Sequence, residues 1–130
     1  MMKAMVLART ADVGTSPLQL REIPIPNPGP EEVLVRLTVC GVCRTDLHVV
    51  EGELADPALP LIPGHQAVGI VSQVGAGVSE RKVGERVGIA WLQRTCSICE
   101  FCTSGRENLC ERARFTGYQV DGGYAEYALV

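Results

Sequence analysis

Four cysteines near the end of the chain have the spacing of a metal site. The run C-S-I-C-E-F-C-T-S-G-R-E-N-L-C contains Cys96, Cys99, Cys102 and Cys110, with two residues between each of the first three and seven before the fourth. Two-residue gaps let successive thiolates converge on one point, and a tetrahedral zinc ion takes four such ligands. Because four protein ligands leave no open position, the site is expected to be structural.

The alternative interpretation of these cysteines is a pair of disulfides. Four cysteines allow three pairings, but dense disulfides belong to secreted chains. The first residues, M-M-K-A-M-V-L-A-R-T, are too few and too quickly polar for a signal peptide. The sequence therefore favours reduced, metal-bound thiolates in a cytoplasmic protein.

A second pair of potential metal ligands lies earlier in the chain. Cys43 lies in G-V-C-R-T-D-L-H, and His65 lies in P-G-H-Q. A thiolate and an imidazole suit a zinc ion that keeps an open position for a substrate. Taken alone, such residues are more often a small core cysteine and a structural histidine than metal ligands.

The composition describes one turn-rich globular domain. The chain has 130 residues, with 12 basic and 15 acidic side chains and a formal net charge of −3. This balance gives no reason to expect a nucleic acid or an anionic membrane as partner. No apolar run is long enough to span a bilayer, and 14 glycines with 8 prolines indicate many turns.

The order of apolar segments and turn signals predicts a mostly β domain. Val33, Val35 and Leu37 alternate with other side chains, which predicts a half-buried strand. The expected strands span 3–7, 18–23, 32–40, 67–74, 85–90 and 124–130, with a short helix at 44–50, an extended segment at 60–63, a turn at 75–77 and an irregular cysteine lobe at about 91–114.

Five motifs in this order carry a resemblance to a known family. They are G-V-C-R-T-D-L-H, L-P-L-I-P-G-H, V-G-x-R-V-G, the four-cysteine run and D-G-G-Y-A-E-Y. Together they closely resemble the zinc-dependent alcohol dehydrogenases of the medium-chain dehydrogenase/reductase superfamily. The resemblance covers essentially all of residues 1–130 and implies the GroES-like catalytic domain, a partly open β-barrel with short helices and an irregular zinc-binding lobe.

The resemblance implies roles for five residues of the first two motifs. Cys43 and His65 would bind a catalytic zinc. Thr45 would contact the substrate oxygen, His48 would pass the proton towards solvent, and Arg44 would lie near the cofactor pyrophosphate. Simpler explanations remain open, since Thr45 could cap a helix, while His48 and Arg44 could be ordinary surface residues.

Expectations also follow for four further residues. Trp91 would narrow the alcohol pocket, although a core aromatic is an equal alternative. Asp46 could support the metal ligands or replace one of them, and Cys40 is expected to be a buried small residue. Gln66 stands where the family usually has Glu, and its neutral side chain should leave the zinc more electropositive and bound water more acidic.

Parts of the family pattern are missing from the 130 residues. The third ligand of the catalytic zinc and the Rossmann domain that binds NAD or NADP are expected beyond residue 130, and no G-x-G-x-x-G occurs. The strand pattern at 124–130 runs to the last residue, which favours a fragment that is inactive alone.

The full-length parent is expected to be a homo-oligomer that oxidises alcohols to aldehydes or ketones. Two alternatives stay open: a polyol, sugar or amino-alcohol dehydrogenase of the same superfamily, and a non-catalytic, zinc-stabilised β module.

Overall fold

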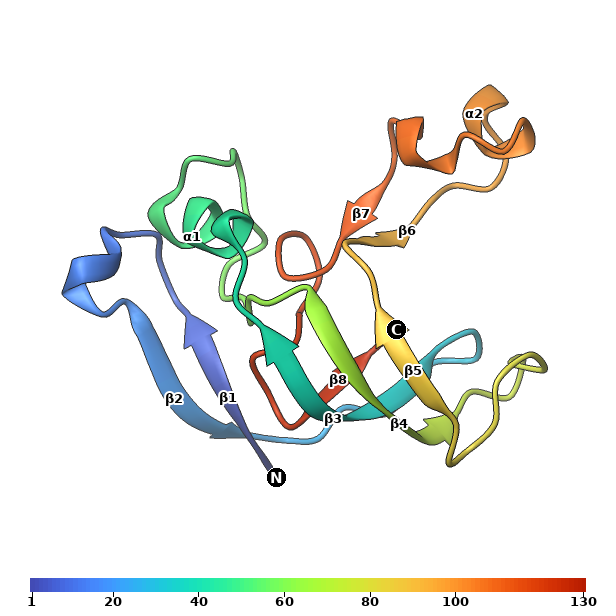
Figure 1. The fold of residues 1–130 in the computed structure, drawn as a ribbon, viewed down its shortest axis with the longest axis horizontal. Coiled ribbons are helices and arrows are strands. Elements are labelled where there is room, and N and C mark those ends of the chain that lie inside the picture. The colour runs from blue at the N-terminus through green and yellow to red at the C-terminus, as the bar shows by residue number, and fades with distance from the viewer.

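The computed structural model describes residues 1–130 as three small antiparallel sheets with short helices between them (Figure 1). The strands are β1 (Met2–Leu7), β2 (Leu18–Ile23), β3 (Val33–Gly41), β4 (Gln66–Val74), β5 (Arg86–Ile89), β6 (Leu92–Arg94), β7 (Arg114–Phe115) and β8 (Tyr127–Leu129). The helices are α1 (Arg44–Glu51) and α2 (Glu100–Thr103), with 3-10 turns η1 (Val13–Thr15) and η2 (Glu107–Leu109).

The central sheet has the strand order β5–β4–β3–β8. The alternation predicted for the third strand is absent at its start, because Val33, Leu34 and Val35 are all buried, and Val39 of the predicted inward row is 57% exposed. Val33 and Val35 belong to an apolar cluster on one face of the sheet, whereas Leu34 is buried outside that cluster. The core cluster on this face consists of Val33, Val35, Ala67, Val71, Ile89 and Ala128.

The β1–β2 hairpin forms a second sheet beside the first, and single bridges join it to the rest. Leu7 pairs with Leu61, and Ala4 pairs with Ala125. Met2, Ala4, Val6 and Ile62 form the apolar cluster of this sheet, with Tyr124 and Tyr127 packed against it. The segment at 124–126 therefore connects β1 to the central sheet, since Tyr124 bonds to Met5 of β1 and Glu126 bonds to both Lys3 of β1 and Leu37 of β3.

The β3–β4 pairing positions the segment that carries the predicted catalytic ligands. The two strands are antiparallel, and Gly41 at the end of β3 lies opposite Gln66 at the start of β4. Helix α1 begins directly after β3 and ends at Gly52, whose φ of +78° is the left-handed conformation that glycine adopts readily. Cys43 and His65, just outside the paired strands, therefore lie at the same end of the ladder.

The cysteine-rich segment leaves the sheets as a separate lobe (Figure 1). Its stem is the short β6–β7 sheet, in which Leu92 pairs with Phe115. Helix α2 and η2 lie in the part of the lobe beyond this stem.

The sequence predicted a mostly β, partly open barrel with short helices. The mostly β fold with short helices is confirmed, and its sheets are open. The helix expected at 44–50 is present with one further residue. The last strand is shorter than predicted, because only Tyr127–Leu129 pairs with β3. The cysteine lobe, expected to be irregular, contains the short helix α2. No helix reaches the length and apolar character that crossing a membrane requires.

Candidate functional site

The four cysteines of the lobe converge as their spacing predicts. Their sulfur atoms all lie within 4.8 Å of one another. The Sγ atom of Cys102 is 3.9 Å from that of Cys96 and 3.5 Å from that of Cys99. A tetrahedral ion with metal–sulfur bonds of about 2.3 Å needs sulfur–sulfur separations of roughly 3.8 Å. The donor set therefore fits such an ion, and all six cysteines of the chain are free thiols.

Backbone amides of the lobe stabilise these sulfurs as thiolates. The amide of Cys99 donates to the Sγ atom of Cys96 over 3.3 Å, and the amide of Cys96 donates to that of Cys110 over 3.4 Å. Chiefly because the amide of Ile98 also donates to its sulfur, the pKa of Cys96 falls to about 6. Hydrogen bonds to the charged form of a group favour that form. The lobe therefore prepares Cys96 to bind a cation.

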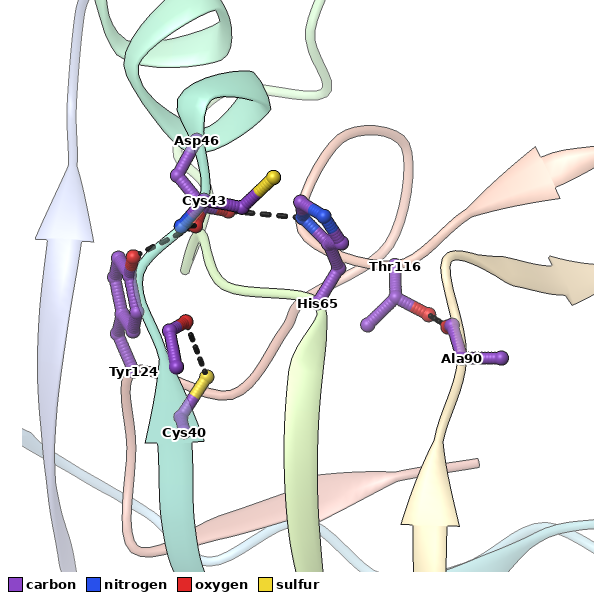
Figure 2. A network of polar contacts seen from close by, with 8 residues as sticks. Cys40, Cys43, Asp46, His65, Ala90, Thr116 and Tyr124 are labelled. Atoms are coloured by element: carbon purple, nitrogen blue, oxygen red, sulfur yellow. Dashed lines mark hydrogen bonds and ion pairs between the residues drawn. The ribbon is translucent and has the colours of Figure 1, made fainter.

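The Asp46 carboxylate links the two predicted ligands of the second site. Asp46 is 3% exposed and His65 is 7% exposed. Oδ2 of Asp46 accepts a hydrogen bond from the backbone amide of Cys43 over 2.8 Å, and Oδ1 lies 2.9 Å from Nδ1 of His65. Figure 2 shows the three residues grouped above the ends of β3 and β4. The structure thus brings Cys43 and His65 together through one buried carboxylate.

The hydrogen bond to Asp46 determines which nitrogen of His65 is available. An ionised carboxylate can only accept, so Nδ1 of His65 must carry the proton. In the neutral ring this leaves the lone pair on Nε2, which is the arrangement of a histidine metal ligand. Both oxygens of Asp46 are hydrogen-bonded, one to the amide of Cys43 and the other to the ring of His65.

The predicted relay residues lie on α1. Thr45 is half-buried in its first turn. Nδ1 of His48 lies 2.6 Å from Oε2 of Glu53, with the His48 side chain 32% exposed. Glu53 lies just after the helix. The sequence analysis did not identify it, and its position five residues after His48 was the only signal of this contact. Arg44 is exposed at the start of the helix.

Trp91 lies against the imidazole of His65. The two ring centroids are 4.8 Å apart at an interplanar angle of 64°. Trp91 also stacks with Phe115 and with Tyr118, at ring-centroid distances of 4.9 Å and 6.1 Å. The backbone of Trp91 accepts a hydrogen bond from the amide of Thr116. Trp91 therefore belongs to an aromatic stack beside the second site, and the sequence did not reveal its two stacking partners.

Tyr124 is the functional candidate that the sequence analysis missed. Its hydroxyl donates to Oδ2 of Asp46 over 2.8 Å (Figure 2). The residue lies in the D-G-G-Y-A-E-Y motif, but nothing in that motif indicates a partner 78 residues away. Cys40, expected to be buried, is only half-buried, and burial together with nearby Asp46 raises the pKa of its thiol.

Comparison with protein families gives one match over most of the chain. Residues 29–130 match the family described as the alcohol dehydrogenase GroES-like domain. The chain is 55% identical over 112 residues to an alcohol dehydrogenase of Geobacillus stearothermophilus, covering 85% of the chain and 33% of that protein. It is 48% identical over 129 residues to an alcohol dehydrogenase of Moraxella sp. strain TAE123, covering 98% of the chain and 37% of that protein.

Solved structures of the same kind share the fold. The structure of a cobalt- and zinc-bound thermostable alcohol dehydrogenase from Pyrobaculum aerophilum superimposes with a TM-score of 0.89 at 35% sequence identity. The match covers 99% of this chain and 38% of that one. The chain thus spans about a third of the length of the curated relatives it matches.

Proposed function

Because the chain belongs to the alcohol dehydrogenase GroES-like domain family, we propose that it is the catalytic domain of a zinc-dependent alcohol dehydrogenase. The observation that carries the proposal is the Asp46 carboxylate, which contacts both the amide of Cys43 and the ring of His65. A domain stabilised by the cysteine lobe alone has no use for a second pair of ligands oriented in this way. The proposal therefore replaces the simpler alternative of a non-catalytic β module.

Two groups of residues would hold metal in this domain. The four cysteines of the lobe would hold a structural zinc, and Sγ of Cys43 with Nε2 of His65 would hold a catalytic zinc. A catalytic zinc supplies Lewis-acid chemistry, which lowers the pKa of an alcohol that it binds. The third protein ligand would come from outside the 130 residues. Asp46 would keep the His65 lone pair directed at the metal.

Thr45 and His48 would manage the proton of the alcohol. The Thr45 hydroxyl, in the first turn of α1, would accept a hydrogen bond from the substrate hydroxyl. His48 is partly exposed and paired with Glu53, so its ring could take a proton from within the site and release it to solvent. Removal of a proton along a defined path is what general base catalysis of alcohol oxidation requires.

The aromatic stack would form one wall of the substrate pocket. Trp91 packs against His65 and is itself stacked on Phe115 and Tyr118. A rigid apolar wall beside the metal would exclude water and would offer few hydrogen-bond partners to a hydroxyl-rich substrate. This arrangement supports small alcohols, and their aldehydes, over polyols or sugars.

The hydride acceptor would be NAD or NADP, bound mainly by a domain that these residues do not include. Arg44 is exposed at the start of α1 and forms no ion pair within the chain. A guanidinium in that position can bind phosphate oxygens in a bidentate manner. We therefore assign Arg44 to the cofactor pyrophosphate.

The test is a chimera in which the chain replaces the matching third of the Geobacillus stearothermophilus alcohol dehydrogenase. The 130-residue chain alone is expected to be inactive, and the chimera should oxidise ethanol with NAD. Substituting Cys43→Ser should lower kcat/KM of the chimera by at least a hundredfold, since it removes a metal ligand. The measurement is the rate of NADH formation, with zinc content determined on the same samples.

The matched control is Cys40→Ser, the same chemical change three residues earlier. Cys40 donates only to the carbonyl of Gly41, a contact that serine can keep, so this variant should retain the activity of the parent chimera. A folded, zinc-containing chimera whose activity is unaffected by Cys43→Ser would contradict the proposal.

A further inference from the structure

The hydroxyl of Tyr124 reaches the second metal site from a distant part of the sequence. It donates to Oδ2 of Asp46 over 2.8 Å, across 78 residues of chain. We propose that Tyr124 is a positioning residue, which holds the Asp46 carboxylate in the orientation that fixes the ring of His65. The inference rests on the proposed function in that it takes Cys43 and His65 as the metal ligands.

The three hydrogen bonds to Asp46 hold different oxygens of its carboxylate. Oδ1 receives only the Nδ1–H of His65, whereas Oδ2 receives both the amide of Cys43 and the hydroxyl of Tyr124. Two donors on Oδ2 fix the carboxylate plane, and the plane determines where Oδ1 lies. Without the tyrosine hydroxyl, a single amide would hold Oδ2, and the carboxylate could rotate away from His65. Tyr124 thus acts on the metal ligand through Asp46.

Tyr124 is itself fixed against the segment that precedes His65. Its backbone amide donates to the carbonyl of Pro63, and its carbonyl accepts from the amide of Met5. Its ring covers Gly64, where an added Cβ would lie 2.7 Å from Cδ1 of the tyrosine. Gly64 also has a φ of +97°, a conformation that favours glycine. The tyrosine is therefore held close to His65 before any metal binds.

The hydroxyl of Tyr124 keeps its proton, and can therefore donate a hydrogen bond, at neutral pH. Burial, followed by the hydrogen bond to Asp46, raises the pKa of Tyr124 above its usual value. A raised pKa favours the neutral phenol, so the proton that Asp46 accepts is present throughout the neutral range.

The experiment compares Tyr124→Phe with Tyr127→Phe in the 130-residue chain. Both tyrosines pack against the same apolar cluster, so each variant loses one hydroxyl from that cluster, and only Tyr124→Phe also loses a hydrogen bond to Asp46. The lobe is first loaded with zinc, and Co²⁺ is then titrated into the second site. Binding is followed by the cobalt–thiolate absorption and by the fluorescence of Trp91, the only tryptophan of the chain, whose ring lies 4.8 Å from that of His65.

Tyr124→Phe should weaken Co²⁺ binding by about 3- to 10-fold. This effect is smaller than the 10- to 100-fold typical for a direct partner of a ligand, because Tyr124 acts through one further residue. The zinc content of the lobe should not change, and Tyr127→Phe should bind Co²⁺ as the wild type does. Equal affinity in Tyr124→Phe and wild type, or equal weakening in both variants, would overturn the inference.

A spectroscopic measurement tests the inference without any second metal. In ¹⁵N NMR spectra the wild type should show His65 as one tautomer, with the proton on Nδ1. In Tyr124→Phe a second population with the proton on Nε2 should grow several-fold, and in Tyr127→Phe it should not. Identical tautomer populations in wild type and Tyr124→Phe would overturn the inference. A wild type that binds no Co²⁺ would mean that Cys43 and His65 need the third protein ligand, which lies outside the 130 residues; the tautomer comparison then decides the role of Tyr124, and the activity of the chimera separately decides the proposed function.

Discussion

Asp46 is a buried charge whose cost is offset by three hydrogen bonds. An ionised carboxylate that is 3% exposed is unfavourable unless donors surround it. The amide of Cys43, the ring of His65 and the hydroxyl of Tyr124 supply those donors. Because the donors come from three segments, satisfying one charge also fixes the relative positions of those segments. This is how a single residue assembles a site from distant parts of the chain.

The lowered pKa of Cys96 predicts how zinc leaves the lobe. The amide of Ile98 stabilises the Cys96 thiolate and holds its pKa at about 6. A group whose folded-state pKa is lowered stabilises the folded lobe above its ordinary pKa, and this contribution is lost as the pH falls through the lowered value. Zinc should therefore stay bound at pH 7 and leave the lobe only as the pH falls below about 6.

The measurement is the zinc released to a coloured chelator at stepwise lower pH. Cys40→Ser should follow the wild type, because Cys40 lies outside the lobe and the pKa of its thiol is raised by burial. Loss of half of the zinc already between pH 7 and pH 8 would show that the amides do not stabilise the thiolates.

At the level of secondary structure, the sequence predicted the elements better than their pairing. Alternating apolar side chains such as Val33 and Val35 predicted the strand correctly, although Leu34 between them is buried as well, so the predicted one-sided burial was wrong there. Register depends on contacts between strands, so the Gly41–Gln66 pairing that aligns the two ligands was not visible. The four cysteines were predictable because their geometry is local, whereas the contact between Tyr124 and Asp46 is not.

The aromatic stack shows the same limit of sequence reasoning. Trp91 was recognised through the family resemblance. Phe115 and Tyr118, which stack on it, come close only through the β6–β7 pairing that brings Leu92 opposite Phe115. Contacts of this kind depend on the tertiary fold, and no local pattern in the sequence indicates them.

The close approach of β3 and β4 predicts opposite effects for two neighbouring glycines. A Cβ at Gly69 would lie 2.4 Å from the carbonyl oxygen of Arg36, whereas a Cβ at Gly88 would have no atom within 4 Å. Gly69→Ala should therefore lower the free energy of unfolding by about 1–3 kcal/mol. Gly88→Ala should leave it unchanged or raise it by up to about 1 kcal/mol.

Urea unfolding of the zinc-loaded proteins measures both effects. The glycines lie in the adjacent strands β4 and β5, with Val68 opposite Gly88, so the two variants probe one ladder. Equal stability of the two variants would mean that β3 and β4 can separate without cost at this point.

Across the whole molecule, the two proposed metal sites depend on different sources of stability. The second site lies at the end of the central sheet, next to segments held by both apolar clusters. The lobe extends away from these sheets on its two-stranded stem (Figure 1). It contributes no residue to either cluster, and its apolar side chains Ile98 and Leu109 are 73% and 50% exposed. The lobe thus has no core of its own.

Metal removal should therefore unfold the lobe and leave the sheets folded. Structural zinc typically contributes about 10–16 kcal/mol of apparent binding free energy, and nothing else in the lobe can replace it. After chelation, or in Cys102→Ser, amides between residues 95 and 113 should exchange hydrogen rapidly, while those of β3 and β4 should stay protected. Cys40→Ser, which removes a thiol outside the lobe, should leave both regions protected. Simultaneous loss of protection in lobe and sheet would mean that the zinc stabilises the whole domain, because only then would the two-stranded stem transmit unfolding to the central ladder.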